Sequence, residues 1–337
     1  MLPPSGTTPV PGIHVPGEER PYRPRYLRAA ILFLLTFFTT TTLGPAVYLW
    51  TRTDMTTDLL PWMSPGVIRG VWSDPFLLRL GLSFSVPVLL ILLAHELGHY
   101  IACRRYGLSA TLPYFLPLPL MLGTLGAFIR IRSPIRGKRE LFDVGVAGPL
   151  AGFVMLVPFL LYGVARSEPA LVEPGIGSLL VPGHCLALDL AVRLFHGPLE
   201  EGMVMNFHPF ALAAWFGLLA TAINLIPLGQ LDGGHILYAA AGRWQRRLAV
   251  PIWLLLAVAG FSWSGWWVWC VMVLLMGLFH PPVRNERQPL DRKRILLAWV
   301  ALAVLILSFI PRGVEEYQTP TRPGPGEGSG VFVALRP

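Results

Sequence analysis

The stretch HELGH, residues 95–99, places two histidines four positions apart, with a glutamate directly after the first. On a helix, side chains four residues apart lie on one face, so His95 and His99 can bind the same metal ion. This spacing is typical of zinc-dependent proteases, in which the glutamate serves as general base. We therefore predict that His95 and His99 bind zinc and that Glu96 accepts the proton of an attacking water molecule.

These ionisable residues lie near the end of a strongly apolar segment, residues 75–103, which is long enough to cross a membrane. A charged side chain at the centre of a membrane helix costs on the order of 3 kcal/mol on insertion scales. A bound cation would offset that cost, whereas incidental polar residues would have no such compensation. The apolar surroundings therefore favour a metal site over a merely polar patch.

A catalytic zinc site needs a third protein ligand and an open position for water. The next acidic residue along the chain is Glu140, which lies in an arginine-rich loop. Position 105, where some zinc proteases place a third histidine, is Arg105. Asp232 lies in NLIPLGQLDGGH, residues 224–235, at the end of another apolar run. We predict Asp232 as the third ligand, with His235 as the alternative.

The composition indicates a membrane protein. Of 337 residues, 53% are hydrophobic and only 14% are charged, whereas soluble proteins average about 25% charged residues. The net charge is +8, but the arginines stand at the ends of apolar runs, which argues against nucleic-acid binding and for membrane topology signals. The three cysteines are scattered and predict no disulfide framework: Cys103, Cys185 and Cys270.

We predict an all-α polytopic membrane protein with six or seven transmembrane helices and a membrane-associated β-hairpin or re-entrant loop. The predicted spans are 27–50, 75–103, 142–164, 207–228 and 293–310. Segment 248–280 is too long for one ordinary span, and FSWSG at 261–265 is expected to mark a bend or to break it into two short helices. The predicted divisions are a flexible cytoplasmic tail (1–26), a first anchor and its extracytoplasmic connection (27–74), an intramembrane metalloprotease core (75–310) and a Pro/Gly-rich tail (311–337).

The hairpin or re-entrant loop is predicted for residues 111–132, an apolar segment interrupted by three prolines and two glycines. Two interpretations remain open for it. An edge strand here could hold an extended substrate by β-augmentation, or the segment could pack for stability alone. The small residues of GPLAG, residues 148–152, indicate close helix packing.

The distribution of basic residues predicts the orientation. With the N-terminus inside, 19 of the 27 lysines and arginines lie on the cytoplasmic side, in agreement with the positive-inside rule. HELGH and LDGGH then lie toward the cytoplasmic ends of their helices. Residues 1–26 lack the composition of a targeting segment, so we expect a multi-pass protein of the bacterial plasma membrane.

HELGH followed by the distal pattern N-x-x-P-x-x-x-L-D-G-G resembles the site-2 protease family of intramembrane zinc metalloproteases. GTLGAFIRIRSPI and GPLAG resemble the branch that includes cyanobacterial and plastid members, and the loop 165–205 is too short for the PDZ domain of many bacterial members. The resemblance covers residues 75–310. It implies zinc bound by His95, His99 and Asp232, Glu96 as general base, and Asn224 as a residue that holds or polarises the scissile carbonyl.

The resemblance also implies a substrate, namely a transmembrane segment of another, single-pass membrane protein, cut within the lipid bilayer. Two other functions also fit buried ionisable residues: a transporter, or a non-catalytic scaffold that binds membrane proteins. Metal-dependent transport that survives Glu96→Gln would favour the first. One zinc per chain, lost in His95→Ala and retained in Glu96→Gln without cleavage, would favour the protease over both. The sequence indicates neither the substrate's identity nor the oligomeric state.

Overall fold

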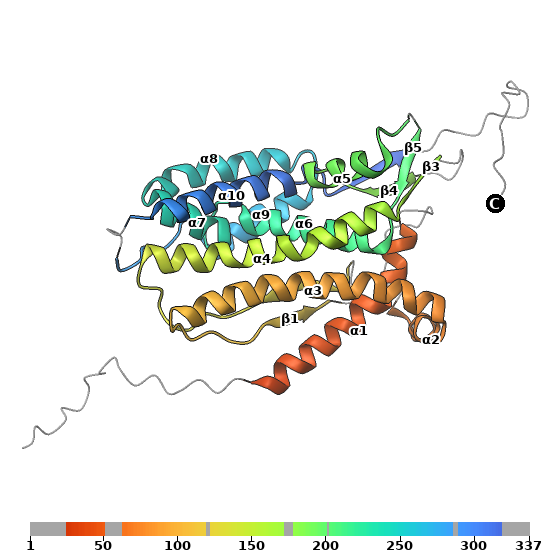
Figure 1. The fold of residues 1–337 in the computed structure, drawn as a ribbon, viewed down its shortest axis with the longest axis horizontal. Helices are drawn as coiled ribbons and strands as arrows, with labels where there is room; N and C mark the ends of the chain where they lie inside the picture. The colour runs from red at the N-terminus through yellow and green to blue at the C-terminus, as the bar shows by residue number, and fades with distance from the viewer. Residues whose placement is uncertain are drawn as a thin grey trace, which may run out of the picture.

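The computed structural model describes residues 25–50, 63–118, 122–171, 178–200, 202–285 and 289–318. The predicted tail 1–26 lies outside the described residues except at its last two positions, and so does most of the tail 311–337. Within the described ranges the fold is mostly helical (Figure 1).

Three helices in the described part of the chain are long and apolar enough to cross a membrane: α1 (Tyr26–Trp50), α3 (Pro75–Arg105) and α4 (Lys138–Ala165). They coincide with the predicted spans to within four residues at each end. Figure 1 shows α3 and α4 side by side, with α1 crossing the other side of α3. Before α3 comes the short helix α2 (Pro65–Ser73), and Asp74 then caps the start of α3 through the N–H groups of Phe76 and Leu77.

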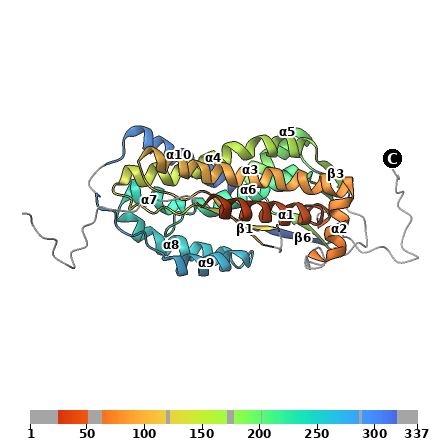
Figure 2. The same cartoon turned by 90° about the horizontal axis from the view of Figure 1, so that it is seen from below.

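Five shorter helices follow later in the chain: α6 (Pro209–Leu225), α7 (Asp232–Ala241), α8 (Trp244–Ala259), α9 (Gly265–Met276) and α10 (Arg292–Ser308). α6, α7 and α10 pack against α4, whereas α8 packs against α7 and α9. The predicted span 207–228 ends as a helix at Leu225, because Pro227 cannot continue it. Segment 248–280 forms two short helices, so the second of the two expectations is confirmed. Figure 2 shows α8 and α9 at one side of the bundle.

Strands occupy three places in the described residues, and each forms a two-stranded antiparallel sheet. β1 (Tyr114–Pro117) pairs with β2 (Thr124–Phe128), β3 (Glu168–Leu171) with β5 (Met203–Asn206), and β4 (Ser178–Pro182) with β6 (Val314–Gln318). The expected hairpin in 111–132 is confirmed, but an all-α fold is too simple a description. Loop 165–205 carries strands and the helix α5 (Leu186–His196), and β6 begins inside the predicted tail 311–337.

Small residues allow α1 to approach both α3 and the hairpin. A Cβ on Gly81 would lie 2.2 Å from the Thr41 carbonyl oxygen, so the two helix backbones are in contact there. Gly123 directly precedes β2 and has a φ of +81°, and a Cβ on it would lie 2.6 Å from the Cα of Thr40. The Thr39 hydroxyl donates a hydrogen bond of 2.6 Å to the Gly123 carbonyl. α1 therefore anchors the β1–β2 hairpin.

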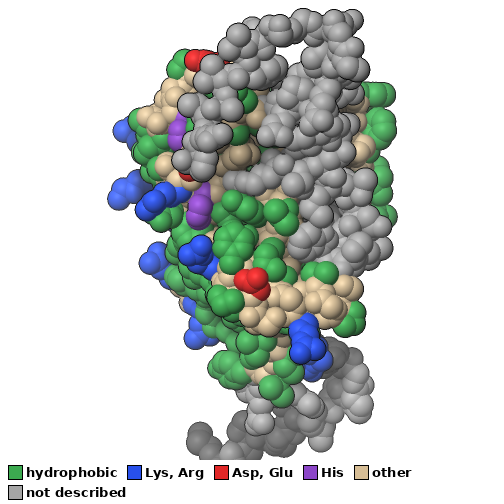
Figure 3. Space-filling view, turned by 90° about the vertical axis from the view of Figure 1, so that its right-hand side faces the viewer, with side chains coloured by type: hydrophobic (Ala, Val, Ile, Leu, Met, Phe, Trp, Pro, Cys, Tyr) green, Lys and Arg blue, Asp and Glu red, His purple; other side chains and the backbone are tan. Residues whose placement is uncertain are grey.

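The two ends of the bundle differ in charge. The end of α3 and the starts of α4 and α10 lie together at the left of Figure 1, and they carry a run of basic residues: Arg104, Arg105, Lys138, Arg139, Arg292, Lys293 and Arg294. Figure 3 shows the opposite end, where basic side chains lie along one side of the visible surface, with fewer acidic and histidine side chains among hydrophobic ones. The basic run where α3 ends and α4 and α10 begin agrees with the orientation that the positive-inside rule predicts.

Candidate active site

Two distant helices bring together three metal-binding side chains. His95 and His99 stand one turn apart on α3, and Asp232 is the first residue of α7. The Nε2 atoms of the two histidines are 3.1 Å apart, and each lies 3.3 Å from Oδ2 of Asp232. His95 and His99 are buried and Asp232 is partly buried, and together they form a group that could hold a metal ion.

The dimensions of this triangle fit zinc. Ligand atoms around a tetrahedral zinc ion, with bonds of about 2.0–2.1 Å, lie about 3.3 Å from one another. Imidazole nitrogen and carboxylate oxygen are common zinc ligands, and three protein ligands leave the fourth position open for water. A site of this composition is therefore suited to a catalytic zinc ion rather than to a purely structural one.

The backbone of α4 sets the orientation of the His99 ring. Nδ1 of His99 lies 2.7 Å from the Val144 carbonyl oxygen, which can only accept a hydrogen bond. Nδ1 therefore carries a proton, and Nε2 faces His95 and Asp232. In the neutral ring, Nε2 presents a lone pair and can bind a cation that Asp232 also binds, whereas a second proton on Nε2 would donate to the carboxylate instead. The hydrogen bond to Val144 thus orients the ring so that Nε2 can act as a metal ligand.

Glycines on α4 make room for these side chains. A Cβ on Gly148 would lie 2.1 Å from Nε2 of His99, and a Cβ on Gly152 would lie 3.2 Å from Cβ of His95. The sequence predicted close helix packing at GPLAG, and the structure shows that the packing partners are the two histidines. The sequence gave no sign that Gly148 and Gly152 contact the histidines of HELGH, because this contact forms only when α3 and α4 pack together.

Glu96 follows His95 on α3 and is 6% exposed. Its carboxylate accepts a hydrogen bond from the backbone N–H of Ile129, the residue after β2. It also interacts electrostatically with both His99 and Asp232, so it belongs to the same cluster. The hairpin therefore contacts the residue that the sequence predicts as general base.

Two other residues from the sequence analysis lie near the end of α6 and on α7. Asn224 is half-buried in the last turn of α6, and its predicted role in holding the substrate carbonyl stays a prediction. His235 is not a member of the metal-binding group among the described residues. Instead, its Nδ1 pairs with Nε2 of His280 at 2.8 Å, while Nδ1 of His280 donates to the Pro281 carbonyl.

Comparison with protein families identifies the chain. The model of peptidase family M50 matches residues 83–259, a segment that holds both HELGH and LDGGH. The chain belongs to peptidase family M50. The resemblance to the site-2 proteases is thereby confirmed, and zinc is the cofactor that the family and the His95, His99 and Asp232 group indicate together.

Named relatives agree with this assignment. The chain is 33% identical over 240 residues to "Probable zinc metalloprotease EGY2, chloroplastic" of Oryza sativa subsp. indica, an alignment that covers 69% of this chain and 42% of the relative. It is 29% identical over 306 residues to "Probable zinc metalloprotease EGY1, chloroplastic" of Arabidopsis thaliana, covering 85% of this chain and 53% of the relative. The chain thus spans about half the length of these relatives or less.

Proposed function

We propose that this M50 protein is an intramembrane zinc endopeptidase that hydrolyses peptide bonds in or near transmembrane segments of other membrane proteins. The observation that carries the proposal is the convergence of His95, His99 and Asp232, 3.1–3.3 Å apart, with two of them inside an apolar helix of 31 residues. A soluble peptidase has no reason to place its site on a helix that can cross a membrane.

The proposed roles follow from the positions of the side chains. His95, His99 and Asp232 hold zinc, which supplies a Lewis acid for water and for the scissile carbonyl. Glu96 accepts a proton from the attacking water and passes it to the leaving nitrogen. The Ile129 N–H fixes the carboxylate of Glu96 while it does so. Each of the four polar side chains of the site thus has a proposed role, either in binding zinc or in proton transfer.

The edge of β2 that faces away from β1 pairs with no strand among the described residues, and this free edge is suited to presenting an extended substrate. Arg130 accepts a hydrogen bond from the Thr111 N–H, so Arg130 faces the β1 side of the ladder. Along a strand, the backbone N–H and C=O groups of successive residues point alternately toward the two edges. Ala127 and Ile129 therefore face away from β1, and Ile129 reaches Glu96 from that edge. We propose that a substrate strand pairs along Ala127, directly beside the general base.

Proline substitution tests the edge. Ala127→Pro removes one backbone donor from the free edge, so cleavage should fall while zinc remains bound. Ala127→Val keeps the N–H and adds two methyl groups, which makes it the matched control. Loss of zinc in the proline variant would instead assign the hairpin to packing alone, the other interpretation that the sequence left open.

We further propose that the shorter helices complete a membrane domain of six or seven spans, and that residues 75–310 form the protease core. The basic end of the bundle, where the site lies, then faces the cytoplasm or the equivalent compartment. The bacterial plasma membrane stays a prediction, because the relatives reported above are named as chloroplastic. A single-pass membrane protein as substrate and the tail at 1–26 likewise stay predictions.

Purified protein decides among the candidate functions. We expect one zinc per chain in wild type and in Glu96→Gln, and none in His95→Ala, by elemental analysis. Comparison of membrane-protein fragments from cells that express wild type or Glu96→Gln should reveal substrates that accumulate uncut in the variant. Solute transport retained in Glu96→Gln would make the protein a transporter, and substrate capture without cleavage by the zinc-loaded wild type would make it a scaffold.

A further inference from the structure

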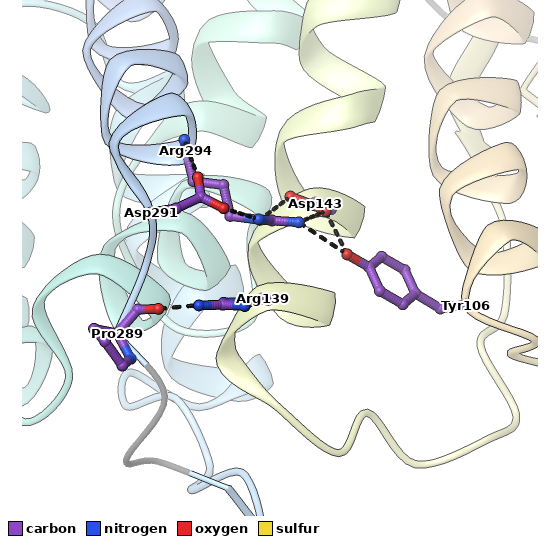
Figure 4. Close-up of polar contacts among 6 residues, drawn as sticks. All are labelled: Tyr106, Arg139, Asp143, Pro289, Asp291 and Arg294. Atoms are coloured by element: carbon purple, nitrogen blue, oxygen red, sulfur yellow. Dashed lines mark hydrogen bonds and ion pairs between the residues drawn. The ribbon is translucent and has the colours of Figure 1, made fainter.

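A charged cluster joins three helices at the basic end of the bundle (Figure 4). Arg294, in the first turn of α10, donates to both carboxylate oxygens of Asp143 on α4: Nε to Oδ1 at 2.8 Å and Nη2 to Oδ2 at 2.6 Å. Tyr106, the residue after α3, donates its hydroxyl to Asp143 Oδ2 at 2.5 Å. Asp291 caps α10 and pairs with the same guanidinium. We call Tyr106, Asp143 and Arg294 the Asp143 clamp.

The clamp is adjacent in sequence to the residue that orients one of the proposed zinc ligands. Asp143 directly precedes Val144, whose carbonyl accepts the hydrogen bond from His99 Nδ1. Tyr106 and His99 are seven positions apart, two turns of α3, so they lie on the same helix face. The same pair of helices is thus joined twice in succession, first through Tyr106 and Asp143 and then through His99 and Val144.

The chemistry of the clamp makes it a rigid connection. A guanidinium that donates two parallel hydrogen bonds to one carboxylate fixes both distance and angle, which a lysine cannot do. The side chains of Arg294 and Asp143 are 21% and 27% exposed, so water screens them only in part. Burial and the hydrogen bond to Asp143 raise the pKa of Tyr106, which keeps its hydroxyl protonated as a donor.

We propose that Arg294 is a positioning residue for the zinc site, and this inference rests on the proposed function. Through Asp143 it holds the first turns of α4 against the end of α3, and thereby fixes the Val144 carbonyl that orients the His99 ring. Arg294 lies outside residues 83–259, the segment that matches the family. The structure thus assigns α10 a role in zinc binding that the matched segment does not contain.

The test measures zinc affinity rather than catalysis. Full-length wild type, Arg294→Gln and Tyr106→Phe are purified in detergent, and zinc dissociation constants are obtained by competition with a chelator. Loss of a partner that orients a ligand weakens metal binding by about 10–100-fold, so we expect at least a tenfold rise in Kd for Arg294→Gln. We expect a smaller rise in Kd for Tyr106→Phe, which removes a single hydrogen bond to Asp143. We expect an intermediate rise for Arg294→Lys, which keeps the charge but loses the paired hydrogen bonds.

Controls separate positioning from general stability. Arg292→Gln removes a charge from the same turn of α10, where Arg292 is exposed, and should leave the zinc Kd unchanged. The absorption spectrum of the cobalt-loaded protein should change in Arg294→Gln and not in Arg292→Gln. Should Arg294→Gln fail to fold, Tyr106→Phe carries the same test.

Three outcomes are distinguishable. A raised zinc Kd in the clamp variants supports the proposal. A folded clamp variant with lowered thermal stability and wild-type zinc affinity overturns it, since the cluster would then act on packing alone. Zinc binding by wild type that persists in His95→Ala overturns the proposed site itself, and the role of the clamp with it.

Discussion

Gly148 and His99 are in such close contact that a Cβ on the glycine would lie 2.1 Å from Nε2 of the imidazole. Real carbon–nitrogen contacts of this kind do not occur below about 3 Å, so one of the two groups would have to move. The backbone of α4 cannot move easily, because α4 packs against α3, α6 and α7. The ring of His99 is therefore the group that a side chain at position 148 would displace.

Gly148→Ala should consequently weaken zinc binding without unfolding the bundle. We expect a loss of activity and of zinc affinity of at least about tenfold, the range seen when ligand orientation is disturbed. Val154→Ala, on the same helix at a position that is 71% exposed, should leave both unchanged. Wild-type zinc affinity in Gly148→Ala would contradict the proposed arrangement of ligands.

Removal of the metal should lower stability as well as activity. A ligand that binds only the folded state, at a hundredfold excess over its Kd, stabilises that state by about 2.7 kcal/mol. Chelator treatment should therefore lower the Tm of wild type, and added zinc should restore it together with cleavage. His99→Ala should show no response of Tm to zinc, and a full response in that variant would argue against this residue as a ligand.

The hydroxyl of Thr39 connects α1 to the hairpin that reaches Glu96. Thr39→Val preserves the shape of the side chain but removes a buried hydrogen bond of 2.6 Å, worth about 1 kcal/mol. We expect reduced kcat with unchanged zinc content, since the hairpin contacts the general base and not the metal ligands. Thr39→Ser keeps the hydroxyl and should keep the wild-type kcat. The Thr42 hydroxyl accepts a hydrogen bond from Trp72 instead of bonding to the described part of the hairpin, so Thr42→Val should leave kcat near that of wild type.

Trp266 anchors the α8–α9 pair to the rest of the bundle. Its side chain is fully buried, stacks on Phe309 with ring centroids 5.2 Å apart, and donates a hydrogen bond of 2.9 Å to the Pro311 carbonyl. Trp266→Ala should destabilise the protein by about 3–5 kcal/mol, as large core truncations do. Trp267→Ala, at a position 44% exposed, should shift the midpoint of unfolding far less in the same denaturation experiment.

Local patterns in the sequence were enough to predict much of the site. The i, i+4 spacing of His95 and His99 requires only that their segment be helical, and the length of the apolar run requires that it be so. Asp232 could be singled out because it is an acidic residue at the end of an apolar run, where Pro227 and Gly229 break the helix and can turn its carboxylate inward. The boundaries of α1, α3 and α4, and the break between α8 and α9, follow from hydrophobicity and from glycine and proline in the same way.

The sequence did not predict the contacts made between helices. Nothing in GPLAG shows that Gly148 lies against His99, and no spacing relates Arg294 to Asp143 or Val144. Such pairs depend on the angle and register at which α3, α4 and α10 pack, which are set by many side chains at once. The sequence by itself therefore determined which residues can bind zinc, whereas only the tertiary structure decided how the α4 backbone and the Asp143 clamp hold them in place.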